Sequence, residues 1–240
     1  MAATTPAAPT APSQGSPDGS PDGSPEGSPI GLFGGTFDPI HYGHLRTAFE
    51  LLQKLALHEV VFIPAGQPPH REVPLASAQL RLSMVRAAVQ DQAGFAVDDR
   101  EIRRQGRSYS IDTLSELRHE HPQRPLCLLL GMDAFLGMPG WHRWRDIFDL
   151  CHVVVAQRPG WDAPVTGPLG EAVAQRGTND VQRLHYSTAG HILVQAVTQL
   201  EIASTDLRAL LLSGRDLRYL VPETVRAIIQ RTGCYAHRDR

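Results

Sequence analysis

Lysine is nearly absent from this 240-residue chain. Lys54 is the only one, so arginine makes up the other 22 of the 23 basic residues. A Walker-type phosphate loop needs a lysine directly after its last glycine, whereas Lys54 lies between Gln53 and Leu55. Schiff-base chemistry would also depend on this one residue, which lies on a predicted amphipathic helix. The composition therefore argues against both classes of enzyme.

Cysteine, net charge and long apolar runs are also scarce. Cys127, Cys151 and Cys234 form no CxxC pair, which argues against a disulfide framework or zinc ribbon and fits a reducing, cytoplasmic compartment. The formal net charge is −2, so no basic field favours nucleic acid or an anionic membrane as a partner. The longest apolar run, residues 126–130, is far below the ~20 residues of a membrane-spanning helix.

Residues 1–29 differ in composition from the rest of the chain. Residues 1–13 are rich in Ala, Thr and Pro, and residues 16–29 repeat Ser-Pro-Asp/Glu-Gly. Such a segment buries no apolar surface, so we expect a disordered tail, more a passive extension than a partner-binding one. It has neither a basic start nor an apolar stretch, so it is not a secretory signal. Residues 30–240 are expected to form a single catalytic domain.

From residue 30 onward, short apolar stretches alternate with amphipathic ones. The predicted strands are residues 30–33, 60–63, 95–97, 126–130, 153–156 and 192–197. The predicted helices are residues 44–57, 77–91, 110–120, 141–150, 205–213 and 222–232. Strands that are apolar throughout are typical of a parallel sheet covered on both faces, so we predict an α/β fold with a doubly wound parallel sheet. Ligands bind such sheets beyond the carboxyl ends of the strands, where the strand order reverses.

The segment after the first strand carries the first candidate site residues. It reads Gly34-Gly35-Thr36-Phe37-Asp38-Pro39-Ile40-His41-Tyr42-Gly43-His44 and leads directly into a helix. The glycines let the backbone approach a ligand closely, and free amides at the helix start favour anions. Two histidines three positions apart can both donate hydrogen bonds to one phosphate chain. The alternatives are a capping histidine beside a packed one, or a metal site, although no third ligand follows at suitable spacing.

This segment resembles the HxGH signature of the nucleotidylyltransferase superfamily and is most similar to bacterial nicotinate-nucleotide adenylyltransferases. A second stretch, Glu201-Ile202-Ala203-Ser204-Thr205-Asp206-Leu207-Arg208, resembles the Ile-Ser-Ser-Thr-x-x-Arg signature of that family. Ser204 or Thr205 would cap a helix whose first amides stay free for phosphate, and Arg208 would add a forked cation. Ala203 replaces the first serine, which removes one hydroxyl contact. The alternative is an ordinary capped helix with a surface arginine.

Gly131-Met132-Asp133, which follows a predicted strand, resembles the start of the family's GxDxxxxxxxW element. Trp141 lies eight positions after Asp133, as that element requires. The Asp133 carboxylate would accept hydrogen bonds from ribose hydroxyls, and the Trp141 indole would stack on a pyridine ring. Trp144 is expected to be a core residue.

Three shorter stretches also resemble family segments, so the resemblance spans residues 30–232. Pro68-Pro69-His70-Arg71 has Arg71 where the family usually carries lysine, which keeps the charge and changes the geometry. The stretch from Ser108 to Leu114 would place Tyr109 near the nicotinate carboxylate. Arg158 begins Arg158-Pro159-Gly160, a further element of that family. The resemblance thus assigns four residues to the nicotinate nucleotide: Arg71, Tyr109, Trp141 and Arg158.

The resemblance implies transfer of the adenylyl group of ATP to nicotinate mononucleotide, giving deamido-NAD and pyrophosphate in NAD biosynthesis. The attacking group is an anionic phosphate, so catalysis would need no general base and would rest on positioning and charge stabilisation. The implied catalytic residues are His41, His44 and Arg208. The implied ATP- and phosphate-binding residues are Gly34, Gly35, Thr36, Phe37, Asp133, Ser204 and Thr205. Mg²⁺ would arrive with ATP, and no metal site of the protein's own is expected.

Several alternatives stay open at this stage. Nicotinamide mononucleotide differs from the acid by one charge and is a possible substrate. Pantetheine-phosphate adenylyltransferases are shorter and usually depend on a lysine, and class I aminoacyl-tRNA synthetases are longer with a lysine-based second signature. A nucleotide-binding regulator without catalysis and a metal-dependent phosphohydrolase belong to other functional classes. The sequence is also compatible with a homo-oligomer.

Overall fold

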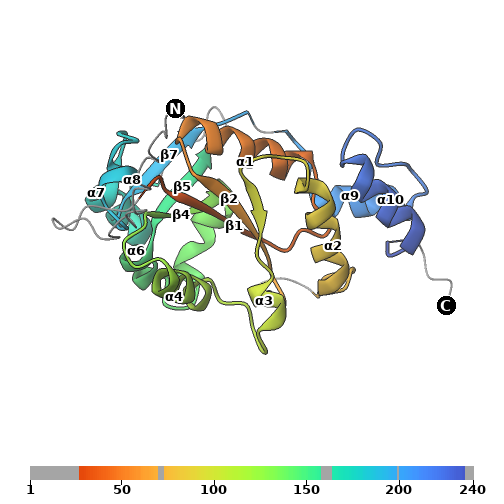
Figure 1. Cartoon of the computed structure of the whole chain (residues 1–240), viewed down its shortest axis with the longest axis horizontal. Helices are drawn as coiled ribbons and strands as arrows, with labels where there is room; N and C mark the ends of the chain where they lie inside the picture. Colours follow the sequence, from red (N-terminus) through yellow and green to blue (C-terminus); the bar gives the residue numbers. More distant parts are fainter. Residues whose placement is uncertain (1–26, 70–72, 158–163, 199, 236–240) are drawn as a thin grey trace, which may run out of the picture.

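The computed structural model describes residues 27–69, 73–157, 164–198 and 200–235. Within these residues, seven parallel strands form one sheet in the order β3-β2-β1-β4-β5-β7-β6 (Figure 1). The strands are β1 (Ile30–Gly35), β2 (Glu59–Pro64), β3 (Phe95–Val97), β4 (Leu126–Gly131), β5 (His152–Gln157), β6 (Gly177–Thr178) and β7 (Ile192–Ala196). The order runs outward in both directions from β1 and β4, so the predicted doubly wound topology is confirmed.

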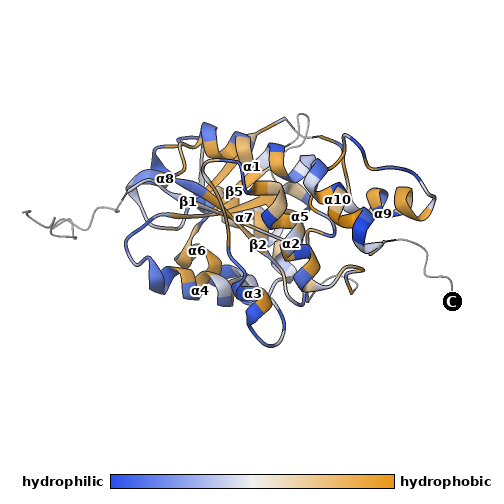
Figure 2. Ribbon diagram, turned by 45° about the vertical axis from the view of Figure 1, so that its right-hand side comes forward, coloured by the Kyte–Doolittle hydropathy of each residue, from blue (hydrophilic) through white to orange (hydrophobic). Residues whose placement is uncertain are grey.

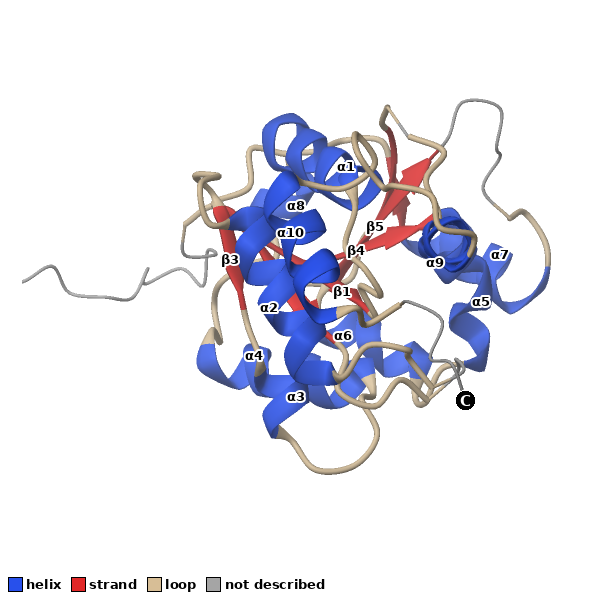
Figure 3. Ribbon diagram, turned by 90° about the vertical axis from the view of Figure 1, so that its right-hand side faces the viewer, coloured by secondary structure: helices blue, strands red, loops and turns tan. Residues whose placement is uncertain are grey.

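The sheet separates two apolar clusters, one on each face. Successive residues of a strand point to opposite faces, so Phe33 joins one cluster and Leu32 the other. The Phe33 face is covered by α1 (Tyr42–Lys54), α2 (Ala78–Val89), α8 (Arg183–Tyr186), α9 (Ser204–Leu212) and α10 (Glu223–Thr232). The Leu32 face is covered by α4 (Ser110–Glu120), α5 (Met132–Gly137), α6 (Ile147–Leu150) and α7 (Gly167–Arg176). Figures 2 and 3 show the apolar strands enclosed between helices.

Helix α1 begins two residues earlier than the apolar pattern predicts. His41 is its N-cap residue, and the Tyr42 amide donates a hydrogen bond to the Leu220 carbonyl. The helix ends at Lys54, and Ala56 turns the chain out of it with a φ of 47°. The predicted span of 44–57 was therefore shifted, because the apolar pattern starts only at Leu45 and continues through residues 55–57, beyond the end of the helix.

The predicted helix over residues 141–150 is wrong. Arg143 has a left-handed φ of 51°, which interrupts any helix at that point. Two short pieces replace it, the 3₁₀ turn η2 (Trp144–Asp146) and α6. Trp144 packs into the core with 7% of its surface exposed, as expected.

Several elements escaped the sequence analysis because most span too few residues to show a period. These are α3 (Arg100–Arg103), α5, the 3₁₀ turn η1 (Met138–Gly140), α7, β6 and α8. Every predicted strand is present with bounds that agree to within two residues. Residues 1–26 lie outside the described part, so the expected tail stays a prediction.

Candidate active site

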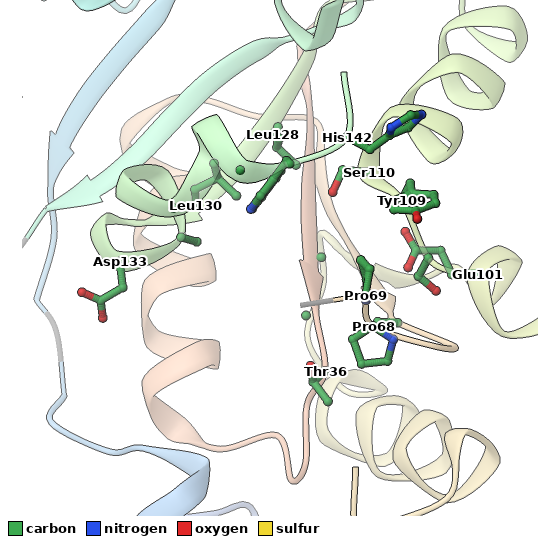
Figure 4. A pocket seen from close by; sticks show the side chains of 18 residues that line it. Thr36, Pro68, Pro69, Glu101, Tyr109, Ser110, Leu128, Leu130, Asp133 and His142 are labelled. Carbon is green, nitrogen blue, oxygen red and sulfur yellow. The ribbon is translucent and has the colours of Figure 1, made fainter. Parts of the chain in front are cut away.

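The sheet opens between β1 and β4, where its strand order reverses. Strand β1 pairs with β2 from Ile30 to Gly35, but it pairs with β4 only over residues 30–32. Beyond that point the two strands part, which is where ligands enter a doubly wound sheet. A cavity of about 410 Å³ lies there. Its walls come from the ends of β1 and β4, the loop after β2, the start of α4, and the segment from α5 to His142 (Figure 4).

The loop after β1 forms the floor of this cavity. Gly34, Gly35 and Thr36 line the cavity directly. Phe37 is buried with a left-handed φ of 49°, and its ring lies over Gly35. A methyl group on Gly35 would come 2.9 Å from Cζ of Phe37, so only glycine fits beneath the ring. Phe37 thus shapes the loop from inside rather than lining the cavity.

His41 and His44 lie face to face at the start of α1. Their ring centroids are 3.7 Å apart at an interplanar angle of 26°, and the His41 amide donates to Nδ1 of His44 at 3.3 Å. Burial lowers the pKa of His41 to about 4, so this imidazole is neutral at pH 7. The structure therefore brings together the two histidines that the sequence singled out.

Gly43 is the reason that His41 fits against the helix. A methyl group at this position would lie 3.0 Å from both Cε1 and Nδ1 of His41 and 3.3 Å from the carbonyl oxygen of Leu200. These distances are shorter than ordinary contacts between heavy atoms, which are about 3.5–4.0 Å. The glycine of the His-x-Gly-His pattern thus provides room for the first imidazole.

The second signature lies directly beside the first. The Ser204 hydroxyl donates to the Pro39 carbonyl at 3.0 Å, and Nη1 of Arg208 donates to the Asp38 carbonyl at 2.8 Å. Nη2 of Arg208 donates to the Thr205 hydroxyl at 3.2 Å. The N-cap of α9 is Ala203, which makes no side-chain capping bond. The expectation that Ser204 or Thr205 caps the helix was therefore wrong, because both hydroxyls bond elsewhere.

The opposite part of the cavity is aromatic. The rings of Tyr109 and His142 are 4.9 Å apart, and Trp141 also lines this part. Figure 4 shows Asp133 on one side of the cavity and Tyr109 and His142 on the other. The structure thus places Asp133, Tyr109 and Trp141 around one cavity. Arg71 and Arg158 lie outside the described residues.

Ser108 and Glu101 are buried cavity residues that the sequence analysis missed. The Ser108 hydroxyl accepts hydrogen bonds from the amides of Gly66 at 3.0 Å and Gln67 at 3.2 Å, which holds the loop after β2. Thr113 donates to Glu101 at 2.7 Å, and burial raises the pKa of this carboxyl. Ser108 is marked only as the first residue of the stretch that resembles a family segment, and no sequence pattern marks Glu101.

Arg81 is a third missed residue, and it is 1% exposed. Its guanidinium donates to the carbonyls of Thr36 at 2.6 Å and Ala65 at 2.7 Å, so it joins the loops after β1 and β2. Arg81 lies on the buried face of α2 with Met84 and Val85. A charge on an otherwise apolar helix face is a sequence signal that could have identified it.

The described part of the chain lacks two features. No group of three or more His, Cys, Asp or Glu side chains comes together as a metal site would require. No helix here is both long enough and apolar enough to cross a membrane.

The chain is similar to known proteins over most of its length. A family model described as cytidylyltransferase-like matches residues 32–210. A protein of Methylococcus capsulatus described as "Probable nicotinate-nucleotide adenylyltransferase" is 49% identical over 207 residues, 86% of this chain and 99% of the relative. A protein of Aeromonas hydrophila with the same description is 47% identical over 205 residues, 85% of this chain and 96% of the relative.

Solved structures agree on the fold. The Plasmodium falciparum nicotinic acid mononucleotide adenylyltransferase complexed with NaAD aligns with a TM-score of 0.68 at 15% identity. The alignment covers 87% of this chain and 98% of that one. At this level of identity, the likeness shows a shared architecture and nothing about individual side chains.

Proposed function

The chain belongs to the nicotinate-nucleotide adenylyltransferase family of cytidylyltransferase-like proteins, and from this premise we propose how its site works. The protein transfers the adenylyl group of ATP to nicotinate mononucleotide, which yields deamido-NAD and pyrophosphate. The observation that carries this function is the meeting of both phosphate signatures at one loop. Ser204 and Arg208 bond to the main chain two to three residues before His41, and Gly34, Gly35 and Thr36, which lead into the same loop, line the cavity.

The reaction is a direct displacement at phosphorus. A phosphate oxygen of nicotinate mononucleotide attacks the α-phosphorus of ATP in line with the bond to the β-phosphate. The new P–O bond forms as that bond breaks, and its electrons leave with pyrophosphate. The nucleophile is already an anion, so the protein has no proton to remove. Rate enhancement therefore comes from positioning and from charge stabilisation.

His41 and His44 act on the ATP phosphates as a pair. Their stacked rings lie at the start of α1, where helix amides favour anions. His41 is neutral at pH 7, because burial lowers its pKa to about 4, so it donates a hydrogen bond without adding a charge. We assign both histidines to the oxygens that gain charge when the bond between the α-phosphorus and the bridging oxygen breaks.

Arg208, Ser204 and Thr205 hold the departing pyrophosphate from the other side. The Arg208 guanidinium is fixed by the Asp38 carbonyl and the Thr205 hydroxyl, which orients its fork before substrate arrives. Gly34, Gly35 and Thr36 would supply close backbone contacts to the nucleotides from the cavity floor, and the buried Phe37 keeps that loop in shape.

The acceptor nucleotide occupies the aromatic part of the cavity. Trp141 offers an indole face for the pyridine ring, and Tyr109 is assigned to its carboxylate end. The Asp133 carboxylate is assigned to ATP, as an acceptor for ribose hydroxyls. Arg71 and Arg158 remain predicted contacts to the acceptor.

Mg²⁺ would arrive with ATP and would neutralise part of the charge on its phosphates. A cytoplasmic location is also proposed. It is supported by the three free cysteines, which suit a reducing compartment.

Pyrophosphate release is the direct test of this function. Purified protein is incubated with ATP and Mg²⁺ and one of three acceptors: nicotinate mononucleotide, nicotinamide mononucleotide or phosphopantetheine. Release with the acid, well above that with the amide, is the expected result. Equal or faster release with another acceptor would show that the assigned acceptor is wrong, while the roles assigned to the phosphate-binding residues would stand. Absence of release with all three would contradict an adenylyltransferase altogether.

A further inference from the structure

The Asp38 carboxylate is a buried junction that the reaction scheme does not use. It is 4% exposed and accepts three hydrogen bonds from two distant segments. The amides of Leu75 and Ala76 donate at 2.9 Å and 3.1 Å, and the Tyr235 hydroxyl donates at 2.6 Å. A buried carboxylate needs such partners, since an unpaired one is strongly disfavoured.

Tyr235 reaches this carboxylate from the far end of the chain. It lies 197 residues from Asp38 in sequence, just beyond α10, where Gly233 turns the chain with a φ of 60°. Tyr235 is 2% exposed, and burial raises the pKa of its hydroxyl, which therefore keeps its proton. Helix α10 packs on α2, so the C-terminal segment is anchored against the body of the fold (Figure 1).

The main chain at the same place holds the second signature. The Asp38 carbonyl accepts from Arg208, and the carbonyl of the next residue, Pro39, accepts from Ser204. His41 follows two residues after Pro39. The Asp38–Pro39 dipeptide, called the joint below, therefore connects the histidine pair to α9. The Asp38 side chain accepts a hydrogen bond from Tyr235, whereas the carbonyls of Asp38 and Pro39 accept hydrogen bonds from Arg208 and Ser204.

We propose that Tyr235 is a positioning residue for the phosphate side of the site. Its hydroxyl fixes the Asp38 carboxylate, and the joint in turn fixes Arg208 and Ser204 relative to His41. This inference rests on the proposed function, because it assigns Tyr235 to the handling of ATP. The aromatic acceptor side has no contact with the joint among the hydrogen bonds of the described residues.

If Tyr235 had a purely structural role, its loss would have different effects on stability and on substrate binding. Loss of a structural tie lowers stability and the fraction of folded enzyme, and it affects both substrates alike. Loss of a positioning contact changes ATP binding and turnover, while the acceptor still binds normally. The two roles are therefore separable by comparing the substrates.

The test is Tyr235→Phe, which removes only the hydroxyl and retains the packed ring. The matched control is Tyr186→Phe, because Tyr186 is 76% exposed on α8, away from the joint. Calorimetry measures binding of an ATP analogue with a methylene bridge between its α- and β-phosphorus, and of nicotinate mononucleotide. Steady-state assays give kcat and both KM values.

We expect Tyr235→Phe to bind the analogue about tenfold more weakly and to lose about tenfold in kcat, the scale of one hydrogen bond to a charged group. Its affinity for nicotinate mononucleotide should equal that of the wild type, and Tyr186→Phe should match the wild type throughout. Unchanged analogue binding, or equal weakening for both substrates, would overturn the proposal.

A double-mutant cycle provides a second readout. Tyr235→Phe and Ser204→Ala act through the same joint, so their effects on analogue binding should be clearly less than additive. Tyr235→Phe and Trp141→Ala act on different substrates and should be additive; the reverse pattern would refute the role of the joint. A wild type that binds the analogue but transfers nothing would contradict the proposed function, while this cycle would still test Tyr235.

Discussion

Gly43→Ala separates the stability of α1 from the geometry of the histidine pair. Gly43 is the second residue of α1 and has a backbone conformation that alanine can adopt. In a helix, alanine is more favourable than glycine by about 0.5–1 kcal/mol. Helix propensity alone therefore predicts a slightly more stable protein. The surroundings of the new methyl group predict a loss of activity.

The size of that loss follows from the distances. The methyl carbon would lie 3.0 Å from two atoms of His41, whereas ordinary contacts are about 3.5–4.0 Å, so the ring must move by about 0.5–1 Å. His41 has little room to move, since it is 4% exposed and stacks on His44 at 3.7 Å. A displacement of about 1 Å can cost about 10²-fold in rate. We therefore expect kcat to fall about ten- to hundredfold.

Steady-state pyrophosphate release and thermal unfolding measure the two effects side by side. The control is Gln53→Ala, at an exposed position in the last turn of the same helix. The expected pattern is a melting temperature within a few degrees of the wild type, because the gain in helix propensity and the crowding against His41 oppose each other, with a depressed kcat and an unaffected control. A Gly43→Ala enzyme with kcat within about twofold of the wild type would refute the argument that His41 must be held in place.

Three further predictions concern the histidines and the loop after β2 that Ser108 holds. His44→Ala should lower kcat about 10²-fold without changing the melting temperature, as for loss of a preorganised donor; a near-normal rate would contradict its role. Burial lowers the pKa of His41 and His152 to about 4 from an ordinary 6.5, so protonation favours the unfolded chain. Stability is complete above pH 6.5 and falls as the pH drops toward 4, by up to about 3 kcal/mol for each histidine. Urea unfolding at pH 7 and pH 4.5 should show a smaller loss for His152→Gln than for the wild type, and equal losses would disprove the contribution. Ser108→Ala leaves the amides of Gly66 and Gln67 without their acceptor. It should raise KM for nicotinate mononucleotide about tenfold and leave KM for ATP unchanged. A rise in KM for ATP alone would contradict the assignment of the loop after β2 to the nicotinate nucleotide.

The sheet was predictable because its strands are apolar at every position. Val153 and Val154 face opposite sides of the sheet and are both fully buried, a pattern that only a sheet covered on both faces permits. Short elements such as α3 and α8 were not predictable, since four residues span about one turn and cannot show a helical period. The break at Arg143 was equally hidden, because no glycine or proline marks it.

The candidate site divides in the same way. His41, His44 and Arg208 stand in short patterns that resemble the phosphate-binding signatures of a known family, and the structure brings them to one loop. The expected cap at Ser204 failed because a hydroxyl near a helix start can bond outward as well as to its own helix. That choice depends on where the Pro39 carbonyl lies, which no local pattern encodes.

By itself, the sequence determined the class of fold and the order of its longer strands, and it predicted which residues would meet the substrates. These follow from hydrophobic periodicity and from short motifs, which are local properties of the chain. Only the tertiary structure decided that Tyr235 bonds to Asp38 and that Arg81 joins two loops. Such contacts bring together residues that are far apart in the chain, and their partners are set by packing, since a buried polar group must find a partner wherever the fold places one.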